Sequence, residues 1–237
     1  YLFEKFNSIM SNISNVNEYK EVLKKFENNF FKSLYVLNSE EIFFLNDFTE
    51  KIKKIIPKDL KDLNQYVFFG NEIKVEEIIL CAKKFPMMGE KQLIIVKNGN
   101  KIYKQIDKIV SQIGSIPAST ILVICIDGVK IDSKKKGIKT INEIGHVYDF
   151  KKIYDNKMHS WIKYISNRLG YEIDFKTCEL IRERTGNNLS KVNVELGKIS
   201  LNTLETEINS RDIMEHFGIN NEYNLFELQN EIGKKNY

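Results

Sequence analysis

The turn Asn38-Ser39-Glu40-Glu41 follows the first apolar run that we predict to be a buried strand, where an α/β nucleotide-binding protein places its phosphate loop. Such a loop needs glycines that let the backbone approach the phosphates, a lysine for their charge and a hydroxyl for Mg²⁺. This turn has no glycine and no lysine, and its two carboxylates would repel a triphosphate. A later apolar run, Gln92–Val96, is followed by Lys97-Asn98 instead of a magnesium-holding acid. The sequence therefore argues against nucleotide hydrolysis and predicts no nucleotide cofactor.

The histidines and cysteines form no catalytic or metal-ligating set, because they lie far apart in the chain: His146, His159, His216, Cys81, Cys125 and Cys178. Glu40 and Glu41 are adjacent at a turn, so they point in different directions, and acids suit the first turn of the helix that follows. Trp161 fits the core stripe of its own helix. We predict no catalytic residue, no metal site and no intrinsic catalysis. Three scattered cysteines favour a reducing, cytoplasmic location.

The charge of the chain is mild overall but uneven. Lys and Arg number 36 and Asp and Glu 32, a net charge of +4. The segment Gly128–Lys139 (GVKIDSKKKGIK) alone holds five lysines and one aspartate. A run of this kind is usually a solvated loop, which is the interpretation that we favour. Contact of Lys134, Lys135 and Lys136 with DNA phosphates is the alternative.

One apolar segment is unusual for a surface turn. Phe85-Pro86-Met87-Met88-Gly89 interrupts a helical pattern and precedes the buried run from Gln92 by only two residues. Four apolar residues on a turn made tight by Pro86 and Gly89 cannot all face the interior. Methionines are favoured at adaptable binding surfaces. The residues alone leave two readings open, a partner-binding loop or one core methionine beside one incidental surface methionine.

Five apolar runs bounded by turn residues predict strands at Ser33–Leu37, Tyr66–Phe69, Gln92–Val96, Thr120–Ile126 and His146–Phe150. Amphipathic helical patterns lie between them, with apolar faces at residues 44–55, 75–82 and 102–113, and one or two helices precede Ser33. Strands that are apolar throughout and alternate with helices indicate a parallel sheet covered on both faces. The fold class is therefore α/β, with a doubly wound, parallel, five-stranded sheet.

After Phe150 the strand signal stops and helices follow. Asp155–Leu169 ends at Gly170, Asp174 caps a second helix that Gly186 ends, and Asn187 or Asn188 caps a third. A fourth runs from Ser210 to Phe217, and Asn220–Tyr237 begins another amphipathic pattern. We expect an α/β domain at 1–150, a small all-α domain at 151–218 and the start of a mostly absent helical domain at 219–237. No run is long enough to span a membrane.

Six segments resemble the delta subunit of bacterial DNA polymerase III, a clamp-loader family. They are YVLNSEEIFFLNDFTEKI from Tyr35, KVEEIILCAKKFPMMGEKQLIIVKN from Lys74, PASTILVICIDG from Pro117, WIKYISNRLGYEI from Trp161, TGNNLSKVNVELGKIS from Thr185 and NLFELQNEIGKK from Asn224. The resemblance runs from about Ser33 to the end. It implies an AAA+-like fold with a degenerate nucleotide site, a helical lid and the start of a collar domain. Ser190 stands where nucleotide-using relatives have an arginine.

The resemblance also implies a bacterial protein of DNA replication that binds and opens the sliding clamp without hydrolysing ATP. Met87 and Met88 take the positions of the family's clamp-inserting apolar pair, flanked by Phe85, Pro86 and Gly89. The implied partners are the polymerase III beta subunit, which is the clamp, other loader subunits, and primer-template DNA through the assembly. A nucleotide-dependent enzyme with an atypical site and a DNA-binding module using Gly128–Lys139 remain the alternatives.

Overall fold

A computed structural model describes residues 11–27, 31–132, 134, 136–202 and 213. The chain divides into two compact units, with the boundary between Lys152 and Ile153. That boundary lies close to the one expected after Phe150. The helix expected at 210–217, apart from Ile213, and the domain start expected at 219–237 lie outside the described residues. No helix of the described part is long and apolar enough to cross a membrane.

The first unit is built on a parallel sheet whose described strands number six, in the order β1-β6-β2-β5-β4-β3. Their bounds are β1 Ser11–Ile13, β2 Leu34–Ser39, β3 Gln65–Phe69, β4 Gln92–Lys97, β5 Thr120–Asp127 and β6 Gly145–Phe150. The predicted α/β class and the five predicted strands are confirmed, and the count of five was one short. The additional strand β1 pairs in parallel with β6, with Ser11 opposite Tyr148. Its three residues are too short and too polar to show an apolar run.

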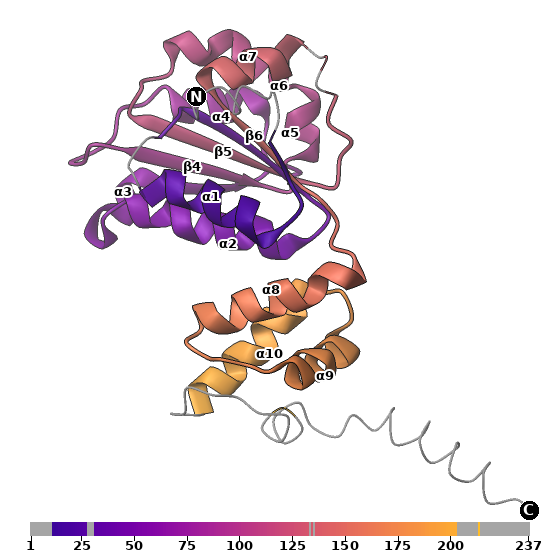
Figure 1. The fold of residues 1–237 in the computed structure, drawn as a ribbon. Helices are drawn as coiled ribbons and strands as arrows, with labels where there is room; N and C mark the ends of the chain where they lie inside the picture. The colour runs from indigo at the N-terminus through magenta and orange to yellow at the C-terminus, as the bar shows by residue number, and fades with distance from the viewer. Residues whose placement is uncertain (1–10, 28–30, 133, 135, 203–212, 214–237) are drawn as a thin grey trace, which may run out of the picture. The chain divides into compact units, whose positions relative to one another are not determined.

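Helices cover both faces of this sheet (Figure 1). One face carries α1 (Val16–Glu27), α2 (Ile42–Ile52) and the short α3 (Lys61–Asn64), and the other carries α4 (Val75–Ala82), α5 (Asn100–Lys104), α6 (Ile106–Gln112) and α7 (Lys136–Ile144). Single 3₁₀ turns follow α2 at Lys53–Ile55, precede α3 at Lys58–Leu60 and follow α6 at Ile113–Ser115. The helix expected through Ile55 therefore ends in a 3₁₀ turn, two residues before Pro57.

The interior differs between the two faces. Beneath α1 and α2 it is aromatic: Phe44 stacks on Phe150 with ring centroids 5.1 Å apart, and Tyr19 meets Phe44 edge-on at 5.4 Å. Beneath α4 to α7 it is mostly aliphatic, with Ile78, Ile94 and Ile124 among its fully buried members. Both sides of the central strands are therefore dry, which explains why those strands are apolar along most of their length.

The second unit contains α8 (Asp155–Arg168), α9 (Phe175–Thr185) and α10 (Leu189–Asn202). The caps read from the sequence are present: Asp174 Oδ1 accepts from Thr177 N at 2.7 Å, and Asn188 Oδ1 accepts from Lys191 N at 2.8 Å. The hydrogen bond from Thr177 lowers the pKa of Asp174. Gly170 and Gly186 have positive φ after α8 and α9, where a left-handed residue ends a helix.

One expectation about the basic segment is wrong in part. Residues from Lys136 onward belong to α7 and not to a solvated loop. Ile138 and Ile141 on this helix are fully buried in the aliphatic core. The two isoleucines are three residues apart and lie beside several lysines. Over so short a segment this spacing indicates a helix only weakly.

Candidate functional site

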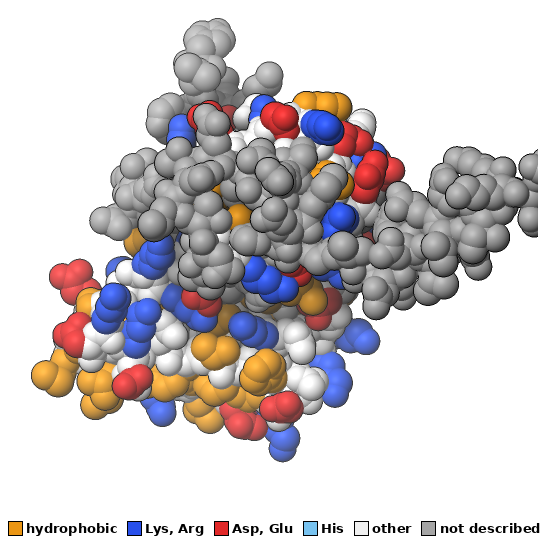
Figure 2. Space-filling model, turned by 90° about the horizontal axis from the view of Figure 1, so that it is seen from below, with side chains coloured by type: hydrophobic (Ala, Val, Ile, Leu, Met, Phe, Trp, Pro, Cys, Tyr) orange, Lys and Arg blue, Asp and Glu red, His pale blue; other side chains and the backbone are white. Residues whose placement is uncertain are grey.

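The segment Phe85–Gly89, termed the apolar loop from here on, lies on the surface between α4 and β4. The exposed fractions of Phe85, Met87 and Met88 are 75%, 57% and 86%. Single exposed apolar residues are ordinary on proteins, and on the face drawn in Figure 2 such residues stand among Lys, Arg, Asp and Glu side chains. Three large ones within four residues are not ordinary. They present a projecting apolar surface that water solvates poorly.

Buried hydrogen bonds hold the helix that leads into this loop. Gln92 Nε2 donates to Cys81 O at 3.0 Å, and Thr120 Oγ1 donates to Ala82 O at 3.0 Å. Cys81 and Ala82 are the last two residues of α4, whose final carbonyls have no partner inside the helix. Gln92 and Thr120 begin β4 and β5. The loop therefore starts from a helix end that is fixed to the sheet.

The middle of the loop is fixed by Asn64, the last residue of α3. Asn64 Oδ1 accepts from Met87 N at 2.6 Å, and Asn64 Nδ2 donates to Met87 O at 2.7 Å. Asn64 is only 1% exposed. Met88, the next residue, has a φ of 56°, in the left-handed region that non-glycine residues rarely occupy. The loop backbone is therefore held in an unusual shape while its side chains face outward.

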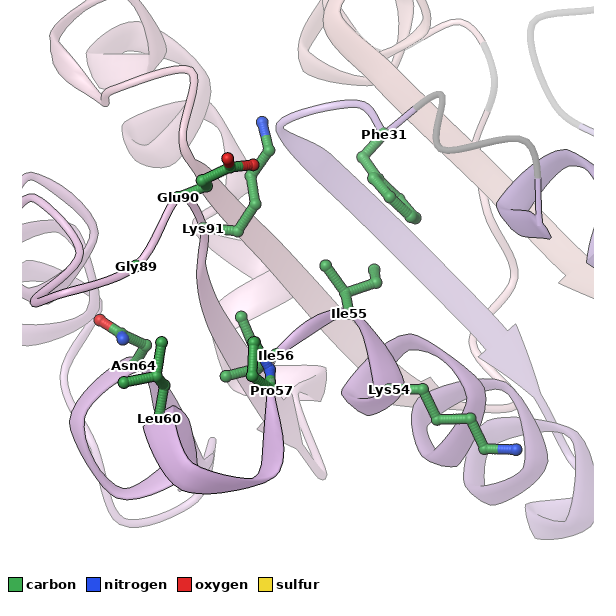
Figure 3. A pocket seen from close by; sticks show the side chains of 10 residues that line it. All are labelled: Phe31, Lys54, Ile55, Ile56, Pro57, Leu60, Asn64, Gly89, Glu90 and Lys91. Carbon is green, nitrogen blue, oxygen red and sulfur yellow. The ribbon is translucent and has the colours of Figure 1, made fainter.

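A hollow of about 480 Å³ lies beside the loop. Figure 3 shows Asn64 and Leu60 on one wall and the backbone of Gly89–Lys91 above them. Phe31 and Ile55 line the opposite side. Gly89, the last residue of the loop, is therefore part of the wall of this hollow.

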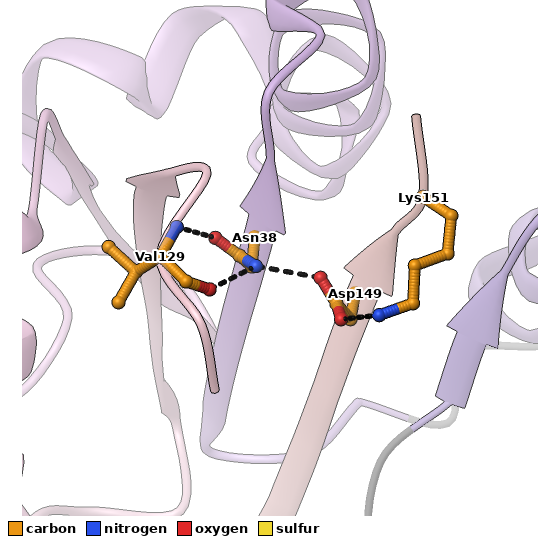
Figure 4. A network of polar contacts seen from close by, with 4 residues as sticks. All are labelled: Asn38, Val129, Asp149 and Lys151. Atoms are coloured by element: carbon orange, nitrogen blue, oxygen red, sulfur yellow. Dashed lines mark hydrogen bonds and ion pairs between the residues drawn. The ribbon is translucent and has the colours of Figure 1, made fainter. Parts of the chain in front are cut away.

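The carboxyl end of β2, where a phosphate loop would begin, is occupied by other groups. Asn38 Oδ1 accepts from Val129 N at 2.9 Å, and Asn38 Nδ2 donates to Val129 O at 2.8 Å and to Asp149 Oδ1 at 2.7 Å (Figure 4). Lys151 forms an ion pair with Asp149. A Cβ at Gly128 would lie 2.8 Å from Glu40 Cγ, so Glu40 packs directly against that glycine.

The neighbouring strand end is closed in the same way. Asp127 N donates to Asn100 Oδ1 at 2.8 Å, and burial raises the pKa of the Asp127 carboxyl. β4 ends at Lys97, one residue later than expected, and Asn98 after it has a φ of 50°. This edge of the sheet therefore presents carboxylates, and the nearby Lys151 is already paired with one of them.

The remaining candidate residues take the structural positions expected of them. Trp161, Cys125 and Cys178 are buried, and burial raises the pKa of the Cys125 thiol to about 12. His146 lies between aromatic rings in β6, and His159 stacks on Phe175 with centroids 4.7 Å apart and contacts Glu179. Ser190 is the second residue of α10. His216 lies outside the described residues.

The basic segment is only partly described. Lys130 and Lys134 are exposed, Lys136 begins α7, and Lys135 lies outside the described residues. No set of His, Cys, Asp and Glu in the described part could hold a metal ion. Sequence reasoning missed Asn64 and the role of Asn38, because each acts on a residue far away in the chain.

Comparisons with known proteins find a similar family model, a similar sequence and a similar fold. Residues 35–151 match the family model described as DNA polymerase III, delta subunit. The DNA polymerase III subunit delta of Bacillus subtilis (strain 168) is 26% identical over 210 residues, which cover 84% of this chain and 60% of that protein. The solved DNA clamp loader delta protein of Bacillus subtilis has the same fold, with a TM-score of 0.70 at 24% identity over 90% of this chain and 65% of that one. The chain thus spans less than two thirds of either relative.

Proposed function

We propose that this chain is a clamp-loader subunit that binds a sliding clamp through the apolar loop. The proposal starts from the match of residues 35–151 to the family model described as DNA polymerase III, delta subunit. The similarity to the DNA polymerase III subunit delta and to the DNA clamp loader delta protein supports this. In this proposal the chain binds and opens the clamp and hydrolyses no ATP itself. Other loader subunits and, through the assembly, primer-template DNA are its further partners.

The observation that carries the proposal is the exposure of Phe85, Met87 and Met88 on a fixed backbone. Apolar anchors that fill a partner's pocket supply most of the free energy at many interfaces. Methionine suits this role because its flexible thioether side chain adapts to an irregular pocket. A rigid helix end and a buried asparagine hold the anchors, so little conformational entropy is lost when a partner binds.

The proposed mechanism is mechanical. The anchors hold one clamp protomer, while α4 behind them bears on the clamp surface. The ring opens because the subunit binds the open clamp more tightly than the closed one, and only such a difference in affinity shifts the equilibrium. No covalent bond is made or broken by this chain. The filled carboxyl end of β2 supports this non-catalytic role.

The test is direct binding of the purified chain to the sliding clamp of its own organism. We expect the two proteins to co-elute in size-exclusion chromatography and to give a saturable titration, with equal affinity in the presence and absence of ATP. Absence of any complex at about 50 µM, a concentration that reveals even weak association, would refute the proposal. A dependence of the affinity on ATP would refute its non-catalytic part.

A second candidate function, contact with DNA phosphates, is favoured by one observation. Lys130 and Lys134 are exposed just beyond Val129, whose backbone is fixed by Asn38. Lysine side chains commonly contact phosphate oxygens of DNA. Duplex binding by the chain alone, falling steeply with salt, would support this function, because phosphate contacts release counterions.

A further inference from the structure

The geometry around the apolar loop points to a residue that a partner does not touch. We propose that Asn64 is a positioning residue: it fixes the apolar loop in its binding conformation before a clamp arrives. This inference rests on the proposed function of the loop and goes one step beyond it. It assigns a role to a buried side chain on α3, a helix that contributes nothing to the exposed apolar surface.

Asn64 holds one residue of the loop through a pair of hydrogen bonds, termed the bracket from here on. The Asn64 side chain takes both main-chain polar groups of Met87, with Met87 N donating to Oδ1 at 2.6 Å and Nδ2 donating to Met87 O at 2.7 Å. An amide side chain that hydrogen bonds both the N–H and the C=O of one residue resembles the pairing between two β-strands. It therefore fixes the orientation of the Met87 main chain. Because Asn64 uses no atom of the Met87 side chain, that side chain stays available to a partner.

The packing of the loop's own large side chains contributes little to holding the loop in this conformation. The loop's large side chains are mostly in water, and the hollow lined by Leu60, Gly89 and Lys91 lies beside its last residues. The positive φ of Met88 is unfavourable for a residue with a side chain. The two hydrogen bonds from Asn64 offset this cost and favour one conformation of the loop.

Two features show that the bracket is itself rigid. Asn64 is followed at once by Gln65, the first residue of β3, so its backbone is continuous with the sheet. A Cβ at Gly89 would lie 3.2 Å from Asn64 Nδ2 and 3.2 Å from Leu60 Cδ1. The glycine thus allows the loop backbone to approach the amide closely. In Figure 3 the Asn64 amide points toward this part of the loop.

The consequence is a population effect. A partner that needs one loop conformation binds with an apparent affinity reduced by the fraction of molecules in that conformation. Losing two hydrogen bonds of ordinary net strength corresponds to about 1–2 kcal/mol, or a factor of about 5 to 30 in the equilibrium constant between this loop conformation and the others. An Asn64→Ala variant should therefore bind the clamp more weakly, by up to about 5- to 30-fold, although every contacting side chain is present.

The experiment compares Asn64→Ala with Asn38→Ala in the full chain. Asn38 is a matched control, because it brackets the backbone of Val129 in the same way but at the carboxyl end of β2. Three quantities are measured for each variant: the melting temperature, the hydrogen-exchange rate of the amides of residues 87–89, and the affinity for the clamp. We expect both variants to melt at lower temperature. Only Asn64→Ala should exchange faster at Met87, by at least about tenfold, and bind the clamp more weakly.

A double-mutant cycle separates positioning from a merely structural effect. In a chain that already carries Met87→Ala and Met88→Ala, the Asn64→Ala change should cause a clearly smaller loss of affinity than in the parent chain, because two of the three anchors on the loop are gone. An equal loss in both backgrounds would overturn the inference. So would unchanged exchange at Met87, or faster exchange with unchanged affinity. If the methionine variant binds like the parent chain, the proposed function fails, and the exchange rates alone still report whether Asn64 holds the loop.

Discussion

Replacing Met87 and Met88 together with alanine should weaken clamp binding by about 2–4 kcal/mol. Complete burial of a methionine side chain contributes about 1.5–3 kcal/mol. Of these two side chains, 57% and 86% remain exposed and are available for burial by a partner. Scaling by those fractions gives the stated range, which is roughly 30- to 1,000-fold in affinity. Since Asn64 bonds only main-chain atoms of Met87, the loop keeps its bracket in this variant.

The assay records binding and stability for the same protein. The buried remainder of the two side chains limits the loss of folding free energy to about 1–2 kcal/mol, which lowers the melting temperature by only a few degrees. Ile42→Ala is the matched control, because Ile42 is also 57% exposed but lies at the start of α2, beyond the carboxyl end of β2. It should bind the clamp as tightly as the parent chain.

Two results would refute this reasoning. The first is a double variant that binds the clamp with parental affinity, which would show that the apolar loop is not the contact. The second is a large drop in melting temperature, of the size expected when two core methionines are truncated at about 2–5 kcal/mol each. That result would contradict the exposed positions of both residues.

Three further predictions concern other parts of the chain. Isothermal titration should detect no saturable ATP binding at millimolar concentration, because Glu40 packs against Gly128 where phosphates would sit; a measurable affinity would contradict this. Replacing Lys134, Lys135 and Lys136 with serine should change the free energy of unfolding by about 0.5 kcal/mol or less and leave clamp affinity unchanged, as urea titration and clamp titration would show. A smaller salt dependence of DNA binding in that variant would instead favour phosphate contact. The free energy of unfolding should fall as pH rises above about 9, because burial raises the pKa of Cys125 from 9.0 and of Tyr35 from 10.0, each to about 12, so the unfolded chain loses these protons first. Urea midpoints that stay constant between pH 8 and about 11 would contradict this sign.

The strands were predictable where a local pattern carried them. β2, β4 and β5 lie in the centre of the sheet and are apolar on both faces, so their runs stand out from the flanking turns. β1 has no such run. β1 forms by pairing with β6, and just after β6 Lys151 N donates to Ile13 O at 2.8 Å. Because β6 lies far away in the sequence, no local pattern could predict this strand. Helix α7 was hidden for a different reason, since its lysines outweighed two buried isoleucines.

The candidate site, too, was predictable only where the local sequence determined the structure. The outward position of the apolar loop was one of two readings of its sequence, because Pro86 and Gly89 leave too little room to bury four apolar residues. The residue that fixes the loop could not be found, because Asn64 is separated from Met87 by 23 positions and sits in no motif. A polar residue that is buried between a helix and a strand has to satisfy its amide somewhere. The sequence does not say where.

In this sheet the exposed candidate site lies at the amino ends of the strands and not at their carboxyl ends. In open α/β sheets, ligands bind beyond the carboxyl ends of the strands. Here that edge is closed by Asn38 on Val129 and by Glu40 against Gly128, whereas the exposed apolar loop lies at the opposite edge, before β4. A loop that binds by apolar contact needs only a rigid sheet behind it. The buried amide of Asn38 provides this rigidity at the carboxyl ends of the strands, and the buried amide of Asn64 provides it beside the loop.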